Sequence, residues 1–283
     1  MSSDPGDSAQ GTVGDVVDDV ASSQPMGWAA RLGLTARALV YLVIGFLGLS
    51  LASGNRAELD QKGALRELLE RPFGTVLVLL CAIGFVGYAL WRFAEAISGP
   101  VGDGGSRSAR LKSAARGVVY TVLAVTAVTV LLGSRSSQGG QQRGLVATVL
   151  TWPGGMLIVL LVGVGVAAAG VGLVVEGWRR KFLKYLDHAD MNESTRTLAR
   201  WTGTVGSIAR GLVVILIGVL LVLAALTGDK EDATGMDGAL KSLRDLPFGN
   251  ILLVLASLGL LIFGVYALVE ARYRRVGVSG AEA

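Results

Sequence analysis

The sequence predicts an all-α membrane protein with six transmembrane helices, arranged as three parallel two-helix repeats around a pseudo-threefold axis along the membrane normal. Three observations lead to this prediction. Hydrophobic residues make up 52% of the 283 positions and charged residues only 17%, so lipid must cover much of the surface. Six apolar tracts are long enough to cross a bilayer. Sequence motifs recur at fixed offsets in each third of the chain.

The chain opens on an acidic segment that is unlike the rest of the sequence. Its first 25 residues contain five aspartates and no lysine or arginine, and they are rich in serine and glycine. This composition predicts a disordered acidic tail over 1–25 and does not fit a secretory signal. We expect repeats at 28–99, 107–186 and 197–275, followed by a short tail at 276–283.

Each expected repeat contains two apolar tracts of about 20 residues, which as helices cross about 30 Å of hydrocarbon. Many of the 40 glycines lie inside these tracts, where they favour close helix packing. The predicted spans are 36–53, 73–91, 114–133, 154–175, 208–227 and 248–269.

The strongest signal is the recurrence of single residues. An Ala-Arg dipeptide opens the first span of each repeat, and a proline precedes the second span. A glycine stands nine residues before each proline and a glutamate 23 residues after it. The recurring residues are Arg37, Arg116 and Arg210; Pro72, Pro153 and Pro247; Gly63, Gly144 and Gly238; and Glu95, Glu176 and Glu270.

These markers also predict local structure. Proline has no N–H and is favoured in the first turn of a helix, so we expect each second span to begin at its proline. Apolar residues three apart precede each proline, as in Leu65 and Leu68. This spacing predicts a short helix on the outer membrane surface before each second span.

The repeated phrases resemble a bacterial family of integral membrane proteins of unknown function, domain of unknown function 1206, whose members carry a pair of transmembrane helices three times. The matching phrases are Ala-Arg-Gly-Val-Val-Tyr at 115–120, Gly-Ala-Leu at 63–65 and 238–240, and Pro-Phe-Gly at 72–74 and 247–249. The resemblance implies an architecture and no activity.

The distribution of basic residues predicts the orientation. Of the 26 lysines and arginines, 17 lie in the N-terminal flank, the two linkers between repeats and the C-terminal segment. Because basic residues stay inside, we expect both termini in the cytoplasm of a bacterium and the protein in its inner (plasma) membrane. We interpret the net charge of +4 as a sign of orientation and lipid contact and expect no nucleic acid partner.

The repeated arginines and glutamates are the candidate functional residues. We expect the arginines at the starts of helices and the glutamates at the ends, where each opposes the helix dipole at a cost of about 0.3–1 kcal/mol. Antiparallel hairpins would bring an arginine and a glutamate together and offset that cost. Two interpretations stay open: structural clasps within each hairpin, or a ring of charge that closes the cytoplasmic mouth of a pathway.

Motifs for catalysis are not found. No Asp, Glu, Lys, Arg or His lies near the middle of a predicted span. One cysteine and one histidine provide neither a disulfide framework nor a metal cluster, and we interpret Asp187, Asp190 and Glu193 beside His188 as a solvated helix face. We therefore expect no catalytic residues, no metal and no cofactor, and the protein is not predicted to be an enzyme.

Two functions remain, from different classes. The first is a non-catalytic structural or accessory membrane subunit, whose partners are the lipid bilayer and another membrane protein. The alternative is a passive channel or carrier for a small solute along the pseudo-threefold axis, and an enzyme acting on lipid is a more remote third. An open, polar axis would favour transport, and a packed apolar axis would favour the accessory function.

Overall fold

The computed structural model describes residues 24–99, 106–134, 136–187, 189–229 and 235–275. The two expected tails lie outside these residues, except that Gln24 and Pro25 already belong to the first helix. Regular structure in the described residues is helical, apart from a single backbone bridge between Leu186 and Arg274.

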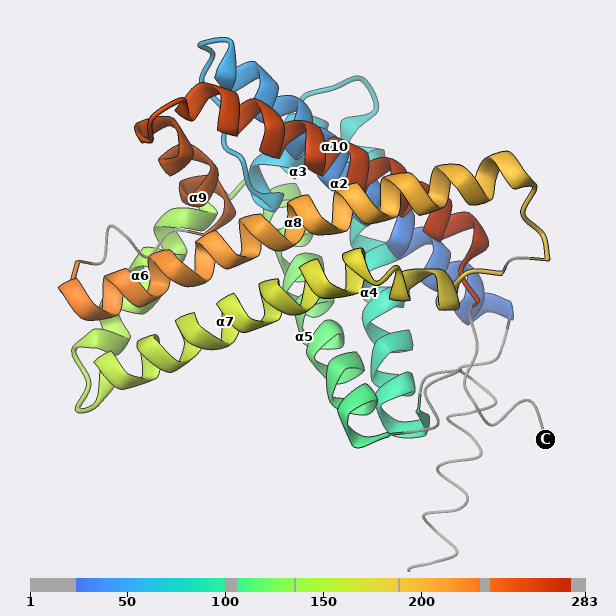
Figure 1. Cartoon of the computed structure of the whole chain (residues 1–283), viewed down its shortest axis with the longest axis horizontal. Coiled ribbons are helices and arrows are strands. Elements are labelled where there is room, and N and C mark those ends of the chain that lie inside the picture. Colours follow the sequence, from blue (N-terminus) through green and yellow to red (C-terminus); the bar gives the residue numbers. More distant parts are fainter. Residues whose placement is uncertain (1–23, 100–105, 135, 188, 230–234, 276–283) are drawn as a thin grey trace, which may run out of the picture.

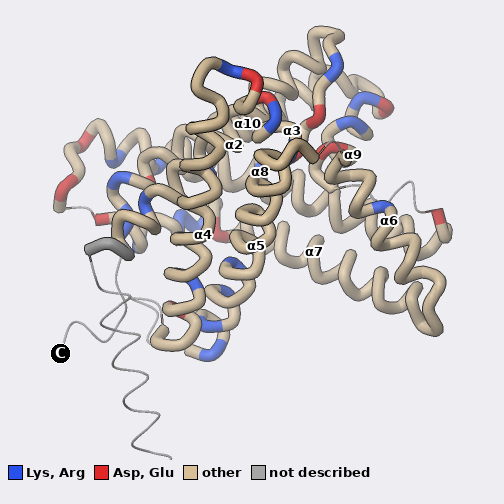
Figure 2. The backbone as a smooth tube through the Cα atoms, turned by 180° about the vertical axis from the view of Figure 1, so that it is seen from behind, with Lys and Arg blue, Asp and Glu red and all other residues tan. Residues whose placement is uncertain are grey.

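Within the described residues, six long helices are apolar enough to cross a membrane. Each extends beyond its predicted tract, because the turns outside the hydrocarbon need not be apolar. Figure 2 shows the result: charged residues gather near helix ends and long uncharged stretches lie between them. The helices are α2 (Gln24–Ala52), α4 (Gly74–Ser98), α5 (Arg107–Leu131), α7 (Gly155–Trp178), α8 (Glu193–Thr227) and α10 (Gly249–Tyr273).

A short helix joins the two long helices of each repeat, as the sequence predicts. These are α3 (Gln61–Leu69), α6 (Gln138–Leu150) and α9 (Met236–Ser242). The segments around them meet at one end of the bundle, which we call the cap end. There Lys62 is 2% exposed, and its Nζ donates hydrogen bonds to the hydroxyls of Ser134 (3.1 Å) and Ser136 (2.9 Å). The backbone N–H of Leu59 donates to Asp237 (2.7 Å), so all three repeats are linked at this end.

The prolines mark the second long helix of each repeat but do not lie within it. Each is followed by a residue with a left-handed backbone, Phe73 (φ 62°), Gly154 (φ 77°) or Phe248 (φ 60°), and the helix begins at the next residue. The expectation of proline in the first turn is therefore wrong. The chain instead turns sharply between the short and the long helix, and a Cβ on the first helical glycine, Gly74, would lie 2.3 Å from the carbonyl oxygen of Leu68.

The six long helices pack in an open arc in the order α5, α4, α2, α10, α8 and α7, and the closest pairs join different repeats. The antiparallel pairs α4/α5, α7/α8 and α10/α2 connect the second helix of one repeat with the first helix of the next, and the third pair joins the last repeat to the first (Figure 1). Within repeats 1 and 3 the helices α2 and α4, and α8 and α10, also pack together. In the described part of repeat 2, α5 and α7 are not packed against one another.

Side chains fill the space between the packed helices. Ile44 of α2, Phe85 of α4 and Leu260 of α10 are 0% exposed and belong to one continuous core. Glycines bring α7 and α8 into backbone contact: a Cβ on Gly170 would lie 2.6 Å from the N of Ile215, and one on Gly218 would lie 2.4 Å from the N of Ala167. Such small-residue contacts are the usual basis of helix association in membranes.

Candidate functional site

Charged and aromatic side chains gather at the end of the bundle where α2 begins and α10 ends, which we call the terminal end. Buried or partly buried arginines from four of the long helices and from the residue after α10 lie among tyrosines, a tryptophan and a phenylalanine. We call the charged residues the terminal cluster: Arg37, Arg92, Arg116, Arg210, Arg274, Glu95 and Glu270.

Glu270 is the centre of one half of the terminal cluster. Its carboxylate accepts a hydrogen bond from Arg37 of α2 at 2.5 Å and another from Arg274, one turn further along its own chain. The side chain of Arg37 is 12% exposed, that of Glu270 7% and that of Arg274 6%, so the bridge is shielded from solvent. It ties the last long helix to the first.

Glu95 is the centre of the other half. It accepts hydrogen bonds from Arg92 on its own helix at 2.5 Å and from the hydroxyl of Ser113 on α5 at 3.0 Å. Arg92 also donates to the phenolic oxygen of Tyr88. These bonds join α4 to α5, which are the second helix of repeat 1 and the first helix of repeat 2.

The expected clasp within each hairpin is not what the structure contains. Of the six predicted residues only Arg37 and Glu270 form an ion pair with each other in the described part of the chain, and they come from different repeats. The reason is that each second helix packs most closely on the first helix of the next repeat. Repeat 2 does have a bridge within its hairpin, but Glu176 of α7 pairs with Lys112 of α5 at 3.9 Å instead of with Arg116, and both side chains are substantially exposed.

The arginines also differ from their expected position along the helix. Arg37, Arg116 and Arg210 lie well inside α2, α5 and α8, because each helix starts at least two turns before its arginine. The supposed conflict with the helix dipole therefore does not arise for these residues, since the dipole acts within the first turn. The glutamates do lie in the last turns of α4, α7 and α10, as predicted.

Aromatic rings separate the arginines of the terminal cluster. The guanidiniums of Arg37 and Arg210 lie 5.5 Å and 5.0 Å from the centre of the Phe263 ring. Those of Arg92 and Arg274 lie 4.6 Å and 5.2 Å from the Trp91 ring. Each is a cation–π contact, which becomes stronger when water is excluded. Two rings therefore lie among the four guanidiniums, and each ring offers a favourable contact to two of these like charges.

Sequence analysis missed Arg92, Arg274 and Trp91: Arg92 and Trp91 recur in no other repeat, and Arg274 has a counterpart in repeat 2, Arg180, but not in repeat 1. A local signal was available, since Arg92 stands three residues before Glu95 and Arg274 four residues after Glu270. Oppositely charged residues at these spacings share one face of a helix.

The marker glycines do not share one role. A Cβ on Gly63 would lie 2.4 Å from the carbonyl oxygen of Glu58, so a close backbone approach requires glycine there. A Cβ on Gly144 would meet nothing within 4 Å. Gly238 lies within α9 at the cap end.

Repeat 2 leaves two helix faces without a partner helix. We call them the open faces; Figure 1 shows α5 lying along α4 and α7 along α8, at a wide angle to each other. A Cβ on Gly165 or Gly172 of α7 would meet nothing within 4 Å. The exposed residues of the open faces are Leu111, Lys112, Ala115 and Val119 on α5, and Gly165, Ala168, Ala169 and Gly172 on α7.

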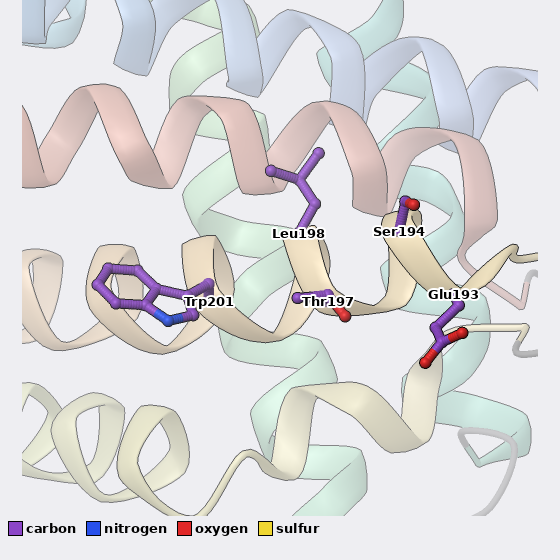
Figure 3. Close-up of a pocket in the computed structure, with 5 residues that line it drawn as sticks. All are labelled: Glu193, Ser194, Thr197, Leu198 and Trp201. Atoms are coloured by element: carbon purple, nitrogen blue, oxygen red, sulfur yellow. The ribbon is translucent and has the colours of Figure 1, made fainter.

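A hollow on the surface of α8 is a weaker candidate. It has a volume of about 590 Å³ and is lined by Glu193, Ser194, Thr197, Leu198 and Trp201. Figure 3 shows that these side chains all come from the first turns of one helix, α8. No group of three or more potential metal ligands is found among the described residues, and the single histidine, His188, lies outside them.

The comparisons with known proteins agree with the three-repeat architecture. The family described as Domain of Unknown Function (DUF1206) matches three times, at residues 32–99, 111–180 and 205–274. The chain is also similar to the uncharacterized protein YxxB of Bacillus subtilis (strain 168), with 32% identity over 249 residues, which cover 87% of this chain and 90% of that protein. No solved structure matches the chain significantly.

Proposed function

This chain belongs to the DUF1206 family, and we propose that it acts there as a non-catalytic accessory membrane protein whose open faces hold a transmembrane helix of another membrane protein. The observation that carries the proposal is a difference between the repeats. In repeats 1 and 3 the second helix is covered by the first helix of its own repeat, and in repeat 2 the corresponding face is uncovered.

The difference is seen residue by residue along the second helices. The position 12 residues after the proline is a glycine in every repeat. A Cβ on Gly84 would lie 2.9 Å from the backbone of Leu32 of α2, and one on Gly259 would lie 2.2 Å from the Cβ of Ala209 of α8. At Gly165 the same Cβ would meet nothing within 4 Å. The second helix of repeat 2 thus has the glycine at which another helix packs in repeats 1 and 3, but no helix of this chain covers it.

The sequence of α5 explains why this helix does not pack against the face of α7 that contains Gly165. Four residues before the repeated arginine stand Gly33 in repeat 1 and Gly206 in repeat 3, and both approach the partner backbone closely. Repeat 2 has Lys112 at this position. A long, charged side chain there prevents the close approach that glycine permits, and burial of its ammonium would be costly. A neighbouring protein can still supply the missing helix.

The chemistry of the open faces favours an apolar helix with small residues as the occupant. Where repeats 1 and 3 carry Trp91 and Tyr266, α7 has Gly172, and where they carry Tyr88 and Phe263 it has Ala169. A surface of glycine and alanine lets another helix approach to backbone contact, which supplies the packing energy that lipid does not. Lys112 and Glu176 at the terminal end can set the register of the occupant.

The packed interior supports this function over transport along the axis. A passive channel or carrier needs a polar path, whereas the core between the described helices is filled by buried apolar residues such as Ile44, Phe85 and Leu260. The excess of lysine and arginine in the segments at the terminal end supports placing both termini in the cytoplasm, with the protein in the bacterial plasma membrane.

Site-specific photo-cross-linking in the native membrane tests the proposal. A photoreactive residue replaces Gly172, and the matched control places it at Val171, which is 51% exposed. The counterparts of Val171 are Leu90 and Val265, also exposed, so this position faces lipid in every repeat. We expect an adduct with one other membrane protein, identified by mass spectrometry, from position 172 and not from 171, and we expect Gly165→Leu to abolish it.

Two results would overturn the proposal. One is an adduct that joins two copies of this chain, which would make the open faces a dimer interface. The other is lipid alone as the adduct at both positions in equal yield. Stability of the purified Gly165→Leu protein serves as the folding control, because the new side chain meets nothing within the isolated chain.

A further inference from the structure

We propose that the terminal cluster binds a phosphate-type anion, held by Arg116 and Arg210. The inference starts from the balance of charge. The terminal cluster contains five arginines and two glutamates, and both glutamates are already engaged: Glu270 with Arg37 and Arg274, and Glu95 with Arg92. Within the described residues Arg116 and Arg210 form no ion pair, although both lie inside long helices of the bundle.

The balance of hydrogen bonds points the same way. The Nε atoms of Arg37, Arg210 and Arg274 and the Nε1 atom of Trp91 are buried, and none of them has a hydrogen-bond partner among the described residues. All four are donors, and the Trp91 side chain is 0% exposed. A buried donor without an acceptor costs free energy, so this site lacks acceptors and has donors in excess. An anion that only accepts hydrogen bonds corrects both imbalances.

These donors belong to one connected group. Arg92 and Arg274 share the Trp91 ring, Arg274 and Arg37 share Glu270, and Arg37 and Arg210 share the Phe263 ring. Arg116 lies one turn before Tyr120 on α5, and the centre of the Tyr120 ring is 4.3 Å from that of Tyr88, whose hydroxyl accepts a hydrogen bond from Arg92. Removing water from like charges at this density is expensive unless a counter-charge is present.

A phosphate group fits this site better than a carboxylate or a halide. It offers several acceptor oxygens around one centre, and arginine's planar fork binds such oxygens through two parallel hydrogen bonds. Its charge of one or two units matches the two arginines that have no carboxylate. The phosphate can come from a lipid headgroup or from free phosphate. Arg116 lies beside Ala115 and Lys112 of the open face on α5, which gives a path from the lipid.

Thermal unfolding in dodecyl maltoside micelles, which contain no phosphate, tests the site. One sample receives inorganic phosphate, a second receives phosphatidylglycerol, and the reference receives sodium chloride at equal ionic strength. A ligand of the folded state raises Tm in proportion to ln(1 + [L]/Kd). We expect one of the two phosphate sources to raise Tm above the chloride reference, and the source that acts at the lower concentration is the ligand.

Two variants and a control locate the effect. Arg210→Gln and Arg116→Gln should each weaken the Tm response so that about tenfold more ligand is needed, which corresponds to one lost charge-assisted contact. Arg110→Gln, an exposed arginine on α5, should leave the response unchanged. Without ligand, both test variants should melt at or above the wild-type Tm, because an unpaired charge has been removed. The proposal is overturned if neither phosphate source exceeds chloride, or if a protein that carries both Arg116→Gln and Arg210→Gln responds like the wild type.

Discussion

Arg37 and Glu270 form a shielded ion pair across 233 residues of sequence, with Nη2 of the arginine 2.5 Å from Oε2 of the glutamate. It joins the last long helix, α10, to the first, α2, at the terminal end, in addition to the close packing of the two helices along their length. Because Arg274 also binds this carboxylate, loss of Glu270 would leave two arginines without a counter-charge.

Substitution Glu270→Gln should therefore lower the free energy of unfolding by about 3–5 kcal/mol, the usual effect of breaking a buried pair. Glu176→Gln is the matched control from repeat 2, and since its pair with Lys112 is exposed we expect a change of about 0–1 kcal/mol. Denaturant titration in mixed micelles measures both. Equal effects of the two variants would show that the pair of Arg37 with Glu270 has no special role.

The three repeated glycines of the second helices offer an internal comparison. Gly84→Leu and Gly259→Leu place a side chain against the backbone or Cβ of a neighbouring helix and should destabilise the protein by about 1–3 kcal/mol or more. Gly165→Leu places its Cβ in open space and replaces a glycine inside helix α7, so it should not lower stability. Tm in detergent reports all three, and a large loss at Gly165 would mean that α5 does cover α7.

The marker glycines at the cap end should separate in the same way. Gly63→Ala brings a Cβ to 2.4 Å from the carbonyl oxygen of Glu58, so we expect a loss of about 1–3 kcal/mol. Gly144→Ala meets nothing and replaces glycine inside helix α6, so we expect a gain of about 0.5–1 kcal/mol. Thermal unfolding distinguishes the two, and effects of the same sign would contradict the contrast between the repeats.

Asp60 should give the cap end a measurable pH dependence. Its carboxylate accepts a hydrogen bond from the N–H of Gly63 at 2.8 Å as the cap of α3, while burial raises its pKa above the ordinary 3.8. The folded state therefore binds the proton at a higher pH than the unfolded chain. Stability should fall as pH rises from the unfolded pKa through the folded pKa.

Two substitutions at Asp60 separate the charge from the cap. Asp60→Asn keeps an acceptor for the N–H of Gly63 and removes this pH dependence, whereas Asp60→Ala also loses the cap, at a cost of about 1 kcal/mol. Unfolding measured between pH 3 and pH 7 separates the two effects. A wild-type stability that rises through this interval, relative to Asp60→Asn, would contradict the raised pKa.

The architecture could be predicted because it depends on signals that are local or repeated. Apolar tracts identify the six spans, and the recurrence of Arg37, Pro72 and Glu95 in later repeats identifies the three units. The pairing of Arg37 with Glu270 could not be predicted in this way. It depends on the packing of α10 against α2, which places the first helix of repeat 1 against the second helix of repeat 3.

The open faces of repeat 2 were not predicted, although the sequence carries their signature. Lys112 occupies the position of Gly33, and Gly172 occupies that of Trp91. Each departure is a single substitution at one offset, and its meaning depends on knowing which helix faces which position. Where one repeat differs from the others at positions that contact another helix, a change in packing should be expected.

Disulfide cross-linking between equivalent positions tests most directly whether repeat 2 is open. Cys81 is first replaced by alanine, and cysteine pairs are then introduced at Ala209 with Gly259 in repeat 3 and at Ala115 with Gly165 in repeat 2. A Cβ on Gly259 would lie 2.2 Å from that of Ala209, nearer than the roughly 3.8 Å of a relaxed disulfide, so α8 and α10 must separate slightly to accept the bridge. A Cβ on Gly165 has no neighbour within 4 Å. In native membranes under mild oxidation we expect the repeat 3 pair to cross-link and the repeat 2 pair to remain reduced. Cross-linking of both pairs at the same rate would show that α5 covers α7 and would contradict the account.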